Sequence, residues 1–328
     1  MNFIAGQCTT DPTGSEHDVF FQDALNGLSQ QQKSLPSKYF YDAAGSRIFE
    51  EICDLDEYYV TRTEMEILNT YCHEMASYFG GGMTVIEPGA GTGKKASILL
   101  SALKKPKQFI PLEISDEAIS MSSDNLSKQH PGVLISPLQG DFTNEVDLQR
   151  VSKLFNQQES RMVFFPGSTL GNFSYEEAIG ILHNLKILAG ESGKILLGVD
   201  LIKDRKRLIA AYDDKKGVTA RFNLNLLTRM NNELGCNFDC QHGFTHKALF
   251  NEQYSRIEMH LVATRDQLIR LGSKHILFNK GETIHTENSH KYSVESIHQL
   301  VSRLGLVIDD RWQDDNQDFG IFLLGPSK

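Results

Sequence analysis

One glycine-rich stretch of the chain has the spacing of a nucleotide-binding turn. EPGAGTG (87–93) follows the apolar run MTVI and precedes a segment with helical spacing. Glycines between a strand and a helix let the backbone approach a ligand closely. Lys94 and Ser97 supply no third glycine at the place that the dinucleotide fingerprint G-x-G-x-x-G requires. The turn therefore predicts a cofactor site and leaves the kind of cofactor open.

Two acidic residues after the next apolar runs extend this site. Glu113 ends the second strand candidate, where an acid can accept hydrogen bonds from both ribose hydroxyls of a nucleoside. A nicotinamide enzyme uses the same arrangement, so Glu113 does not discriminate between cofactors. EPGAGTG resembles the first motif of class I methyltransferases, in which an acid at the position of Asp141 meets the adenine amino group. The alternative for Asp141 is an N-cap of a helix that contains Glu145.

A parallel sheet is needed to bring these residues together. The pattern predicts strands at MTVIEP, 108–115, 133–139, 161–167 and 194–200. Helical stretches separate them at 116–127, 144–156 and 175–189. Strands that alternate with helices indicate a doubly wound α/β fold. LGLVIDDRWQ and DFGIFLLG, near the end of the chain, predict an antiparallel pair at the sheet edge.

Residues 201–291 break this alternation. They contain two helical stretches and then strand-like segments near 244–250, 255–263 and 282–286. We therefore expect an inserted α+β subdomain. The full expectation is a flexible tail at 1–14, a substrate-binding domain at 15–61 and 202–291, and a cofactor-binding domain at 62–201 and 292–328.

Composition argues against several classes of function. The chain is 40% hydrophobic with a net charge of −9, and it has no long basic run that would suit nucleic acid. No apolar run approaches the roughly 18–20 residues of a membrane span, and the first residues lack a secretory signal pattern. Five scattered cysteines argue against a disulfide scaffold. We expect a cytoplasmic, monomeric protein that acts on a small molecule.

Five blocks of the sequence carry a family resemblance. They are SLPSKYFYDAAGSRIFEEICDLDEYYVTRTEMEIL, FFPGSTLGNF, GVDLIKDRKRLIAAYDDKKGVTARFNLNLL, RIEMHL and TENSHKYS. In this order they resemble the histidine-specific Nα-methyltransferases of ergothioneine biosynthesis, from about residue 18 to the C-terminus. The resemblance implies a class I methyltransferase domain that binds S-adenosylmethionine (SAM) and yields S-adenosylhomocysteine, joined to a substrate domain.

The resemblance also implies roles for individual residues. Tyr41 and Phe49 fall beside the reacting centre. The cofactor positions are Gly89, Gly91, Lys95, Glu113, Asp141 and Phe142. Asn172 and Tyr212 fall on residues that hold the substrate carboxylate. The amino group is lined by Gly167, Thr169 and Thr219, the imidazole is met by Tyr58, Glu287 and Ser289, and Met259 forms a pocket wall. The family usually has Asp where this chain has Glu113, which is one methylene longer.

Physical chemistry supports these roles. A free carboxylate needs donors, which an amide and a phenol supply. An imidazole has two distinct nitrogens, so a carboxylate can hydrogen-bond to one of them and a phenol to the other. A ring without such nitrogens would leave Glu287 buried without a partner, which costs several kcal/mol. Without the resemblance, Glu287 would be taken for a loop acid, Tyr212 for a surface aromatic and Met259 for core.

The activity implied is direct in-line transfer of a methyl group to the α-amino nitrogen of L-histidine. The family adds three methyl groups in succession, and aromatic walls such as Phe49 suit a growing ammonium group. The nearest rival is a relative that acts on another aromatic amino acid, such as a prenylated tryptophan. A nicotinamide oxidoreductase and a scaffold without catalysis are more distant alternatives.

We expect no metal. Cys236, Cys240, His242 and His246 lie within eleven residues of one another. Only one residue separates Cys240 from His242, whereas zinc sites place a longer spacer between the cysteine pair and the histidine pair. Transfer from a sulfonium also requires no metal.

Overall fold

The computed structural model describes residues 16–113, 116–144, 148, 151, 155 and 161–327. The chain forms two compact units. The first comprises the chain up to Ile52, Asp213–Leu249 and Glu258–Glu287, and the second comprises Cys53–Tyr212, Phe250–Ile257 and the chain from Asn288. The divisions at 52 and 213 differ from the expected 61 and 202. The tail expected at 1–14 and most of the helix expected at 144–156 lie outside the described residues.

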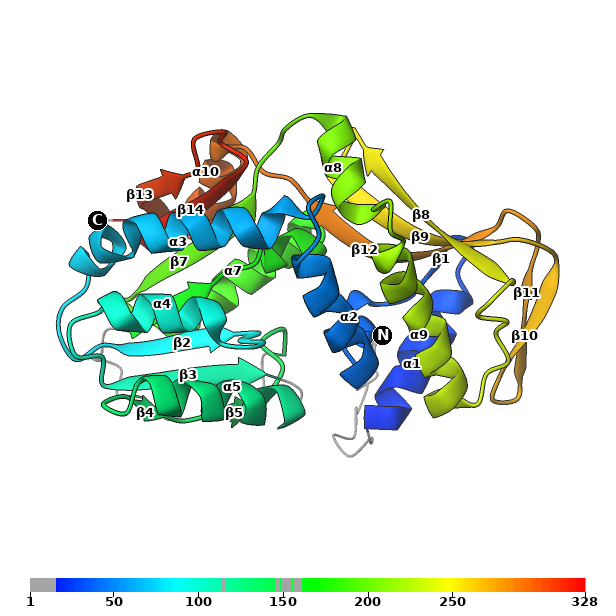
Figure 1. The fold of residues 1–328 in the computed structure, drawn as a ribbon, viewed down its shortest axis with the longest axis horizontal. Helices are drawn as coiled ribbons and strands as arrows, with labels where there is room; N and C mark the ends of the chain where they lie inside the picture. The colour runs from blue at the N-terminus through cyan, green and yellow to red at the C-terminus, as the bar shows by residue number, and fades with distance from the viewer. Residues whose placement is uncertain are drawn as a thin grey trace, which may run out of the picture. The chain divides into compact units, whose positions relative to one another are not determined.

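An eight-stranded sheet forms the centre of the second unit (Figure 1). Its strands are β2 (Thr84–Pro88), β3 (Gln108–Glu113), β4 (Leu134–Ile135), β5 (Leu138–Gln139), β6 (Arg161–Phe165), β7 (Lys194–Asp200), β13 (Leu306–Gln313) and β14 (Phe319–Pro326). The order is β13-β14-β7-β6-β2-β3-β4, and β5 also pairs with β3. All pairings are parallel except the two made by β14. The predicted doubly wound α/β class and the closing antiparallel pair are confirmed.

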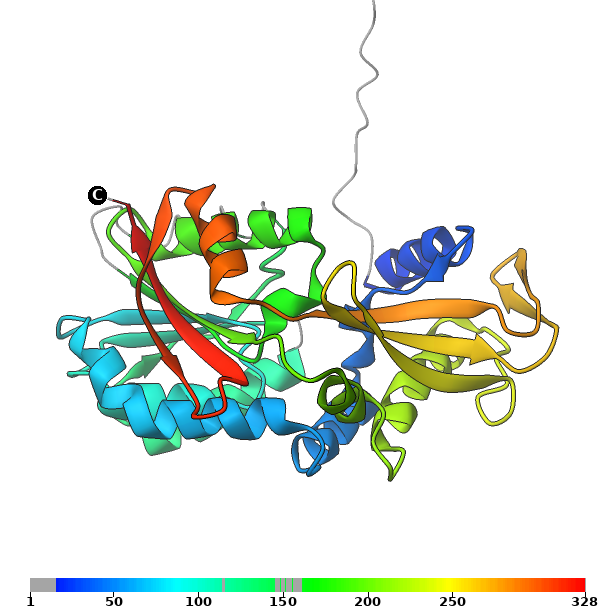
Figure 2. The ribbon, with the colours of Figure 1, turned by 90° about the horizontal axis from the view of Figure 1, so that it is seen from above.

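Helices cover both faces of this sheet. They are α3 (Tyr59–Ser77), α4 (Lys94–Ala102), α5 (Asp116–Gln129), α7 (Tyr175–Ala189) and α10 (Val294–Ser302). Figure 2 shows α7 and α10 on one face and α3 on the other, in agreement with the packing of α7 on β6 and of α3 on β14. The core between the sheet and α7 is built from fully buried aliphatic side chains such as Leu182, Leu185 and Leu197. α7 begins at a capping box that Ser174 and Glu177 form.

One strand of this sheet, predicted to be continuous, is divided into two. Residues 133–139 form two short strands, β4 and β5, each of which pairs separately with β3. Pro137 lies between them and has no N–H to donate to a ladder, so it interrupts the strand.

The first unit combines helices with a second sheet. Its helices are α1 (Glu16–Leu28), η1 (Ser37–Phe40), α2 (Ala43–Cys53) and α9 (Val218–Leu234). Helix α8 (Arg205–Tyr212) belongs to the second unit and ends where the chain returns to the first. The sheet has the order β1-β12-β9-β8, with β1 (Lys33–Ser34), β8 (Phe244–Asn251), β9 (Arg256–Ala263) and β12 (Thr283–His290). β12 is longer than the predicted 282–286. Figure 1 shows β8, β9 and β12 side by side.

A hairpin in this unit was not predicted. β10 (Gln267–Leu271) pairs with β11 (Lys274–Phe278) around Gly272, whose φ is +57°. No helix of the described part of the chain is long and apolar enough to cross a membrane.

Candidate active site

The glycine-rich turn connects β2 to α4 in the second unit. Gly89 and Gly91 adopt φ values of +71° and +51°, in the left-handed region that favours glycine. A Cβ atom at Gly91 would meet no heavy atom within 4 Å, and one at Gly89 would meet the ring of Phe142 at 3.8 Å. The backbone of this turn is therefore accessible to a ligand.

Backbone hydrogen bonds join this turn to the neighbouring strand ends. The N–H of Gly89 donates to the carbonyl of Leu112 at 2.8 Å, and the N–H of Gly140 donates to the carbonyl of Glu113 at 3.0 Å. Asp141 follows directly, and its Oδ1 accepts from the N–H of Thr143 at 2.8 Å. The carboxyl ends of β2, β3 and β5 thus form one edge. Ligands of doubly wound sheets bind at this edge.

Phe142 supplies an aromatic surface at the same edge. Its half-buried ring lies edge-on to Phe165 at 5.5 Å and to Phe173 at 6.2 Å between centroids. The structure therefore brings the predicted cofactor residues Gly89, Gly91, Glu113, Asp141 and Phe142 to one edge of the sheet.

Glu64, which sequence reasoning missed, links Lys95 to the loop after β6. Its fully buried carboxylate accepts from the N–H of Gly167 through both oxygens, at 2.9 Å each, and pairs with Lys95 Nζ at 2.5 Å. A Cβ at Gly167 would lie 3.3 Å from that Nζ. Lys95, predicted to meet the cofactor, and Gly167, predicted to line the substrate amino group, are thus neighbours. Thr169 closes the same loop by donating to the carbonyl of Pro166 at 3.0 Å.

Two predicted substrate residues meet at the end of β12. The hydroxyls of Tyr212 and Ser289 lie 2.7 Å apart, and both side chains are buried. Tyr58, a third predicted substrate residue, lies edge-on to Tyr212 with 6.0 Å between ring centroids. Phenol and hydroxyl donors are therefore concentrated here, as a carboxylate requires.

The loop of Asn172 approaches the same strand end. Gly171 packs so closely that a Cβ there would lie 2.9 Å from the carbonyl oxygen of His290, the neighbour of Ser289. Only glycine permits this approach. Tyr292 donates to the carbonyl of Leu170 at 3.2 Å, which holds the turn in place. The half-buried Asn172 ends this turn.

A buried charged cluster, which sequence reasoning also missed, underlies these hydroxyls. Asp200 is fully buried and pairs with Lys291 at 2.6 Å and with Lys203 at 2.5 Å. The hydroxyl of Tyr59 donates to both of its carboxylate oxygens, at 2.9 and 2.8 Å. Lys291 could have been suspected from its sequence spacing, since it stands two residues beyond Ser289 in TENSHKYS.

Burial and pairing set the pKa values of this cluster. Burial alone would raise the pKa of Asp200, but Lys291 and Lys203 together hold it below its ordinary value. Burial lowers the pKa of Lys203 to about 8, against the opposing effect of Asp200. Burial also acts to lower the pKa of Lys291, but Asp200 and Tyr212 outweigh it and the pKa is raised. Lys291 is therefore charged throughout the neutral range.

The first unit holds the remaining predicted residues. Tyr41, which is 40% exposed, and Phe49 lie edge-on with 5.6 Å between ring centroids, and both also contact Phe222. The N–H of Thr219 donates to Asp214 at 2.7 Å near the start of α9. Burial alone would raise the pKa of Asp214, but this bond and the one from the N–H of Val218 lower it.

Met259 and Glu287 lie on the second sheet. Met259 is 1% exposed, and its carbonyl accepts from the hydroxyl of Thr286 at 3.1 Å. Glu287 is half-buried near the end of β12, and its carbonyl oxygen lies 3.0 Å from Nε2 of His285. Both residues are therefore on adjacent strands, β9 and β12, of one sheet.

A family comparison now identifies the chain. The model of the histidine-specific, SAM-dependent methyltransferases matches residues 20–326. The chain belongs to this family. It is 36% identical over 313 residues to "Histidine N-alpha-methyltransferase" of Mycobacterium tuberculosis (strain CDC 1551 / Oshkosh), covering 94% of this chain and 95% of the relative. Identity to the protein of the same name from Mycolicibacterium smegmatis is 37%, with the same coverage. "Ergothioneine biosynthesis protein 1" of Neurospora crassa is 30% identical over 90% of this chain and 33% of its own length.

The sheet edge of this methyltransferase fits SAM. Glu87, at the end of β2, is fully buried, and its Oε2 has no hydrogen-bond partner among the described residues. Burial raises its pKa well above the ordinary value, and Lys95 opposes this effect only in part. An acceptor of this kind suits a ligand that brings N–H donors, as the amino-acid part of SAM does. Glu113 and Asp141 add acceptors suited to ribose hydroxyls and an adenine amino group.

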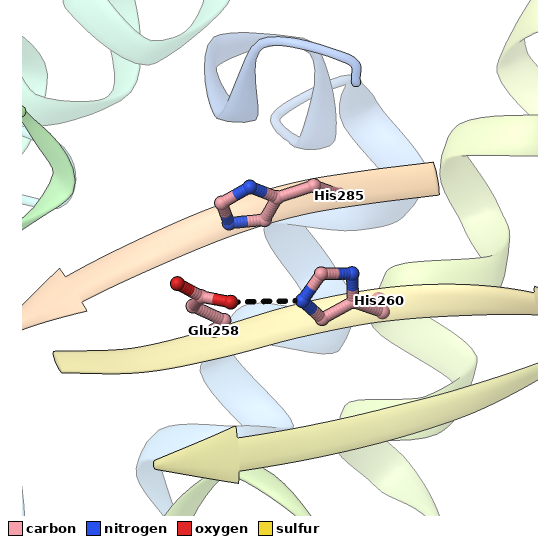
Figure 3. Close-up of side chains that lie close together, drawn as sticks. All are labelled: Glu258, His260 and His285. Atoms are coloured by element: carbon pink, nitrogen blue, oxygen red, sulfur yellow. Dashed lines mark hydrogen bonds and ion pairs between the residues drawn. The ribbon is translucent and has the colours of Figure 1, made fainter. Parts of the chain in front are cut away.

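The absence of a metal remains a prediction for this methyltransferase. Two of the residues considered above as possible zinc ligands have other partners: Cys240 contacts Asn231, and His246 contacts Asn223. In the described part of the chain, one set of three possible ligands has donor atoms within 4.8 Å of one another, namely Glu258, His260 and His285 (Figure 3).

The geometry of this set favours hydrogen bonding. Nε2 of His260 lies 3.1 Å from the carboxylate of Glu258. The rings of His260 and His285 stack with 4.7 Å between centroids and 18° between planes. The nitrogen lone pairs of stacked rings lie in separate, nearly parallel planes, whereas the ligands of a metal must direct their lone pairs at one point.

Proposed function

We propose that this methyltransferase transfers methyl groups from SAM to the α-amino nitrogen of L-histidine. Three successive transfers give the trimethyl betaine hercynine, the first step of ergothioneine biosynthesis. The names of the relatives support the substrate and the pathway. The number of transfers comes from the family resemblance and not from the geometry.

The observation that carries the proposal is the convergence of Tyr212, Ser289 and the loop of Asn172 over a buried ammonium group. The amino-acid carboxylate carries a negative charge, which phenol and amide donors can bind. Lys291 lies 3.1 Å from the Tyr212 oxygen and 2.7 Å from the Ser289 oxygen. This donor-rich, positive environment suits an anion, and it lies in the same unit as the cofactor residues.

The mechanism requires orientation more than chemical participation. Bound SAM supplies an electrophilic methyl group on a sulfonium. The chain holds the substrate carboxylate at Tyr212 and Asn172, which fixes the amino nitrogen two bonds away. Such positioning can provide a large part of the rate acceleration. The amine must be deprotonated to attack, and we assign to Gly167 and Thr169 the task of lining it.

The remaining roles enter the proposal from the resemblance alone. Glu287, Tyr58 and Ser289 contact the imidazole. Met259 forms a wall, and Thr219 lines the amino group. Tyr41 contacts the amine or its methylated forms, and Phe49 faces the growing ammonium group. An enzyme for a different aromatic amino acid is the second candidate. It is disfavoured because an indole has a single ring nitrogen and could not bind Glu287 and Tyr58 together.

Calorimetric titration in the presence of S-adenosylhomocysteine tests the proposal. L-histidine, L-tryptophan and histamine are titrated separately, and NADH is compared with S-adenosylhomocysteine as a cofactor. We expect saturable binding of histidine alone, with a mass spectrum of the products that reaches the trimethyl species. Equal binding of tryptophan would favour the second candidate. A product that stops at monomethylhistidine would refute the threefold transfer.

A further inference from the structure

Lys291 uses all of its hydrogen-bonding capacity inside the second unit. Its side chain is completely buried, and its three N–H groups reach Asp200 at 2.6 Å, Ser289 at 2.7 Å and Tyr212 at 3.1 Å. A lysine ammonium has three donors and no acceptor, so none of its protons remains for a ligand. Lys291 can therefore reach a substrate by hydrogen bonding only through Tyr212 and Ser289.

The two hydroxyls have few remaining protons. Tyr212 and Ser289 bring two O–H protons, and one of them is used in the 2.7 Å contact between their oxygens. Each oxygen also accepts a bond from Lys291. The pair therefore holds one O–H proton beyond the proton in that contact. A phenol is a stronger acid than an alcohol, and the stronger acid forms the better bond to a carboxylate.

We propose that Lys291 is a positioning residue that directs the Tyr212 proton to the substrate carboxylate. In this arrangement Ser289 donates to Tyr212, and Tyr212 donates to the carboxylate. The remaining lone pair of Ser289 then serves as an acceptor for an N–H group. The inference rests on the proposed function because it takes the carboxylate of an amino acid as the ligand.

The charge of the cluster acts in the same direction. Lys291 and Lys203 carry two positive charges against the single negative charge of Asp200. Asp318, which also acts on Lys203, is paired with Arg207 at 2.6 Å, so one net positive charge remains beneath the two hydroxyls. Electrostatic attraction in such a site is stronger than at the surface. The cluster thus favours substrates that carry a carboxylate over amines that lack one.

Substitution of Lys291 by methionine tests this role, because methionine keeps much of the length and removes the charge. Histidine and histamine are titrated into the wild-type enzyme and into Lys291→Met, each saturated with S-adenosylhomocysteine. We expect histidine affinity to fall by about 30-fold or more and histamine affinity to change by less than about threefold. The preference for histidine over histamine is the decisive measurement, because a merely structural defect would weaken both ligands together.

A double-mutant cycle with Tyr212→Phe supplies the second measurement. Since Lys291 acts largely through the Tyr212 hydroxyl, Lys291→Met should cost histidine clearly less affinity in the Tyr212→Phe background than in the wild-type enzyme, about the tenfold that follows from loss of the net charge alone. Additive losses, or an unchanged ratio of histidine to histamine in Lys291→Met, would overturn the inference.

Lys203→Gln keeps the inference testable if Lys291→Met does not fold. It removes the net charge without touching Tyr212 or Ser289, so we expect a loss of histidine affinity of about tenfold with unchanged histamine affinity. An unchanged preference in this variant would also overturn the inference. Failure of the proposed function is distinguishable, because the wild-type enzyme itself would then not bind histidine.

Discussion

Glu64→Gln should weaken both the fold and the activity of this methyltransferase. Glu64 holds two groups at once: the N–H of Gly167, which donates to both carboxylate oxygens, and the ammonium of Lys95. Glutamine keeps the size but replaces one acceptor oxygen by an NH₂ group. That NH₂ group cannot accept from Gly167 and does not neutralise Lys95.

The magnitude follows from the burial of the two partners. Removal of one member of a fully buried ion pair costs about 3–5 kcal/mol. The side chain of Glu64 is fully buried, but that of Lys95 is 20% exposed, so water can solvate part of the released charge. We therefore expect the free energy of unfolding to fall by about 2–3 kcal/mol. If about half of this free energy is lost because the loop of Gly167 is less well positioned in the transition state, the activation free energy rises by that amount and kcat/KM falls about tenfold.

Urea unfolding and steady-state kinetics measure the two effects. Glu66→Gln is the matched control, since Glu66 is an exposed acid two residues along the same helix, α3, and its substitution should change stability by less than about 0.5 kcal/mol. Equal unfolding midpoints for Glu64→Gln and Glu66→Gln would refute the structural reasoning. A destabilised Glu64→Gln enzyme with unchanged kcat/KM would refute the link from Glu64 to the reaction.

Four further predictions follow from the site. Burial lowers the pKa of Lys203 from 10.5 to about 8, so the folded protein loses this proton at a lower pH than the unfolded chain does. The buried charge therefore lowers the free energy of unfolding fully below pH 8, and this loss of stability is relieved as the pH rises toward 10.5. The same loss of charge should raise the KM for histidine above pH 8, and Lys203→Arg should abolish that rise in a pH series. Gly91→Ala forces an L-residue into a φ of +51° and should weaken S-adenosylhomocysteine binding about tenfold by calorimetry, whereas Gly80→Ala, which has open space and no positive φ, should not. Glu287→Leu should reduce the ratio of histidine to tryptophan turnover by about 100-fold or more, and an unchanged ratio would remove the imidazole assignment. Treatment with EDTA should leave the rate unchanged; a rate lost on chelation and restored by zinc would instead assign a metal to the cluster around Glu258.

Local patterns were sufficient to predict the doubly wound sheet. The helix predicted at 175–189 has those bounds in the structure, because Ser174 and Glu177 form a capping box at its start and Gly190 ends it. The hairpin of β10 and β11 was missed although a signal was present. Two alternating runs flank the dipeptide Gly272-Ser273, which is a recognised two-residue hairpin loop.

The cofactor edge was predictable and the charged cluster was not. Gly89, Glu113 and Asp141 lie at or just after the carboxyl ends of strands, and parallel strands bring such residues to one edge. Asp200 also ends a strand, but its partner Lys291 stands 91 residues later in the sequence. No periodicity connects residues so far apart, so only the folded chain reveals their pairing.

Backbone hydrogen bonds between two distant segments place Lys291 beside Asp200. The N–H of Tyr292 donates to the carbonyl of Asp200 at 2.9 Å, and the N–H of Ile202 donates back to the carbonyl of Tyr292 at 2.9 Å. These two bonds fix the register of the two segments, and with it the place where the Lys291 side chain begins. The ammonium is then held by Asp200 at 2.6 Å. Tyr212 and Ser289, whose oxygens accept from this fixed ammonium, therefore lose little entropy when a carboxylate binds, so the cluster lowers the cost of ordering the site as well as attracting the ligand.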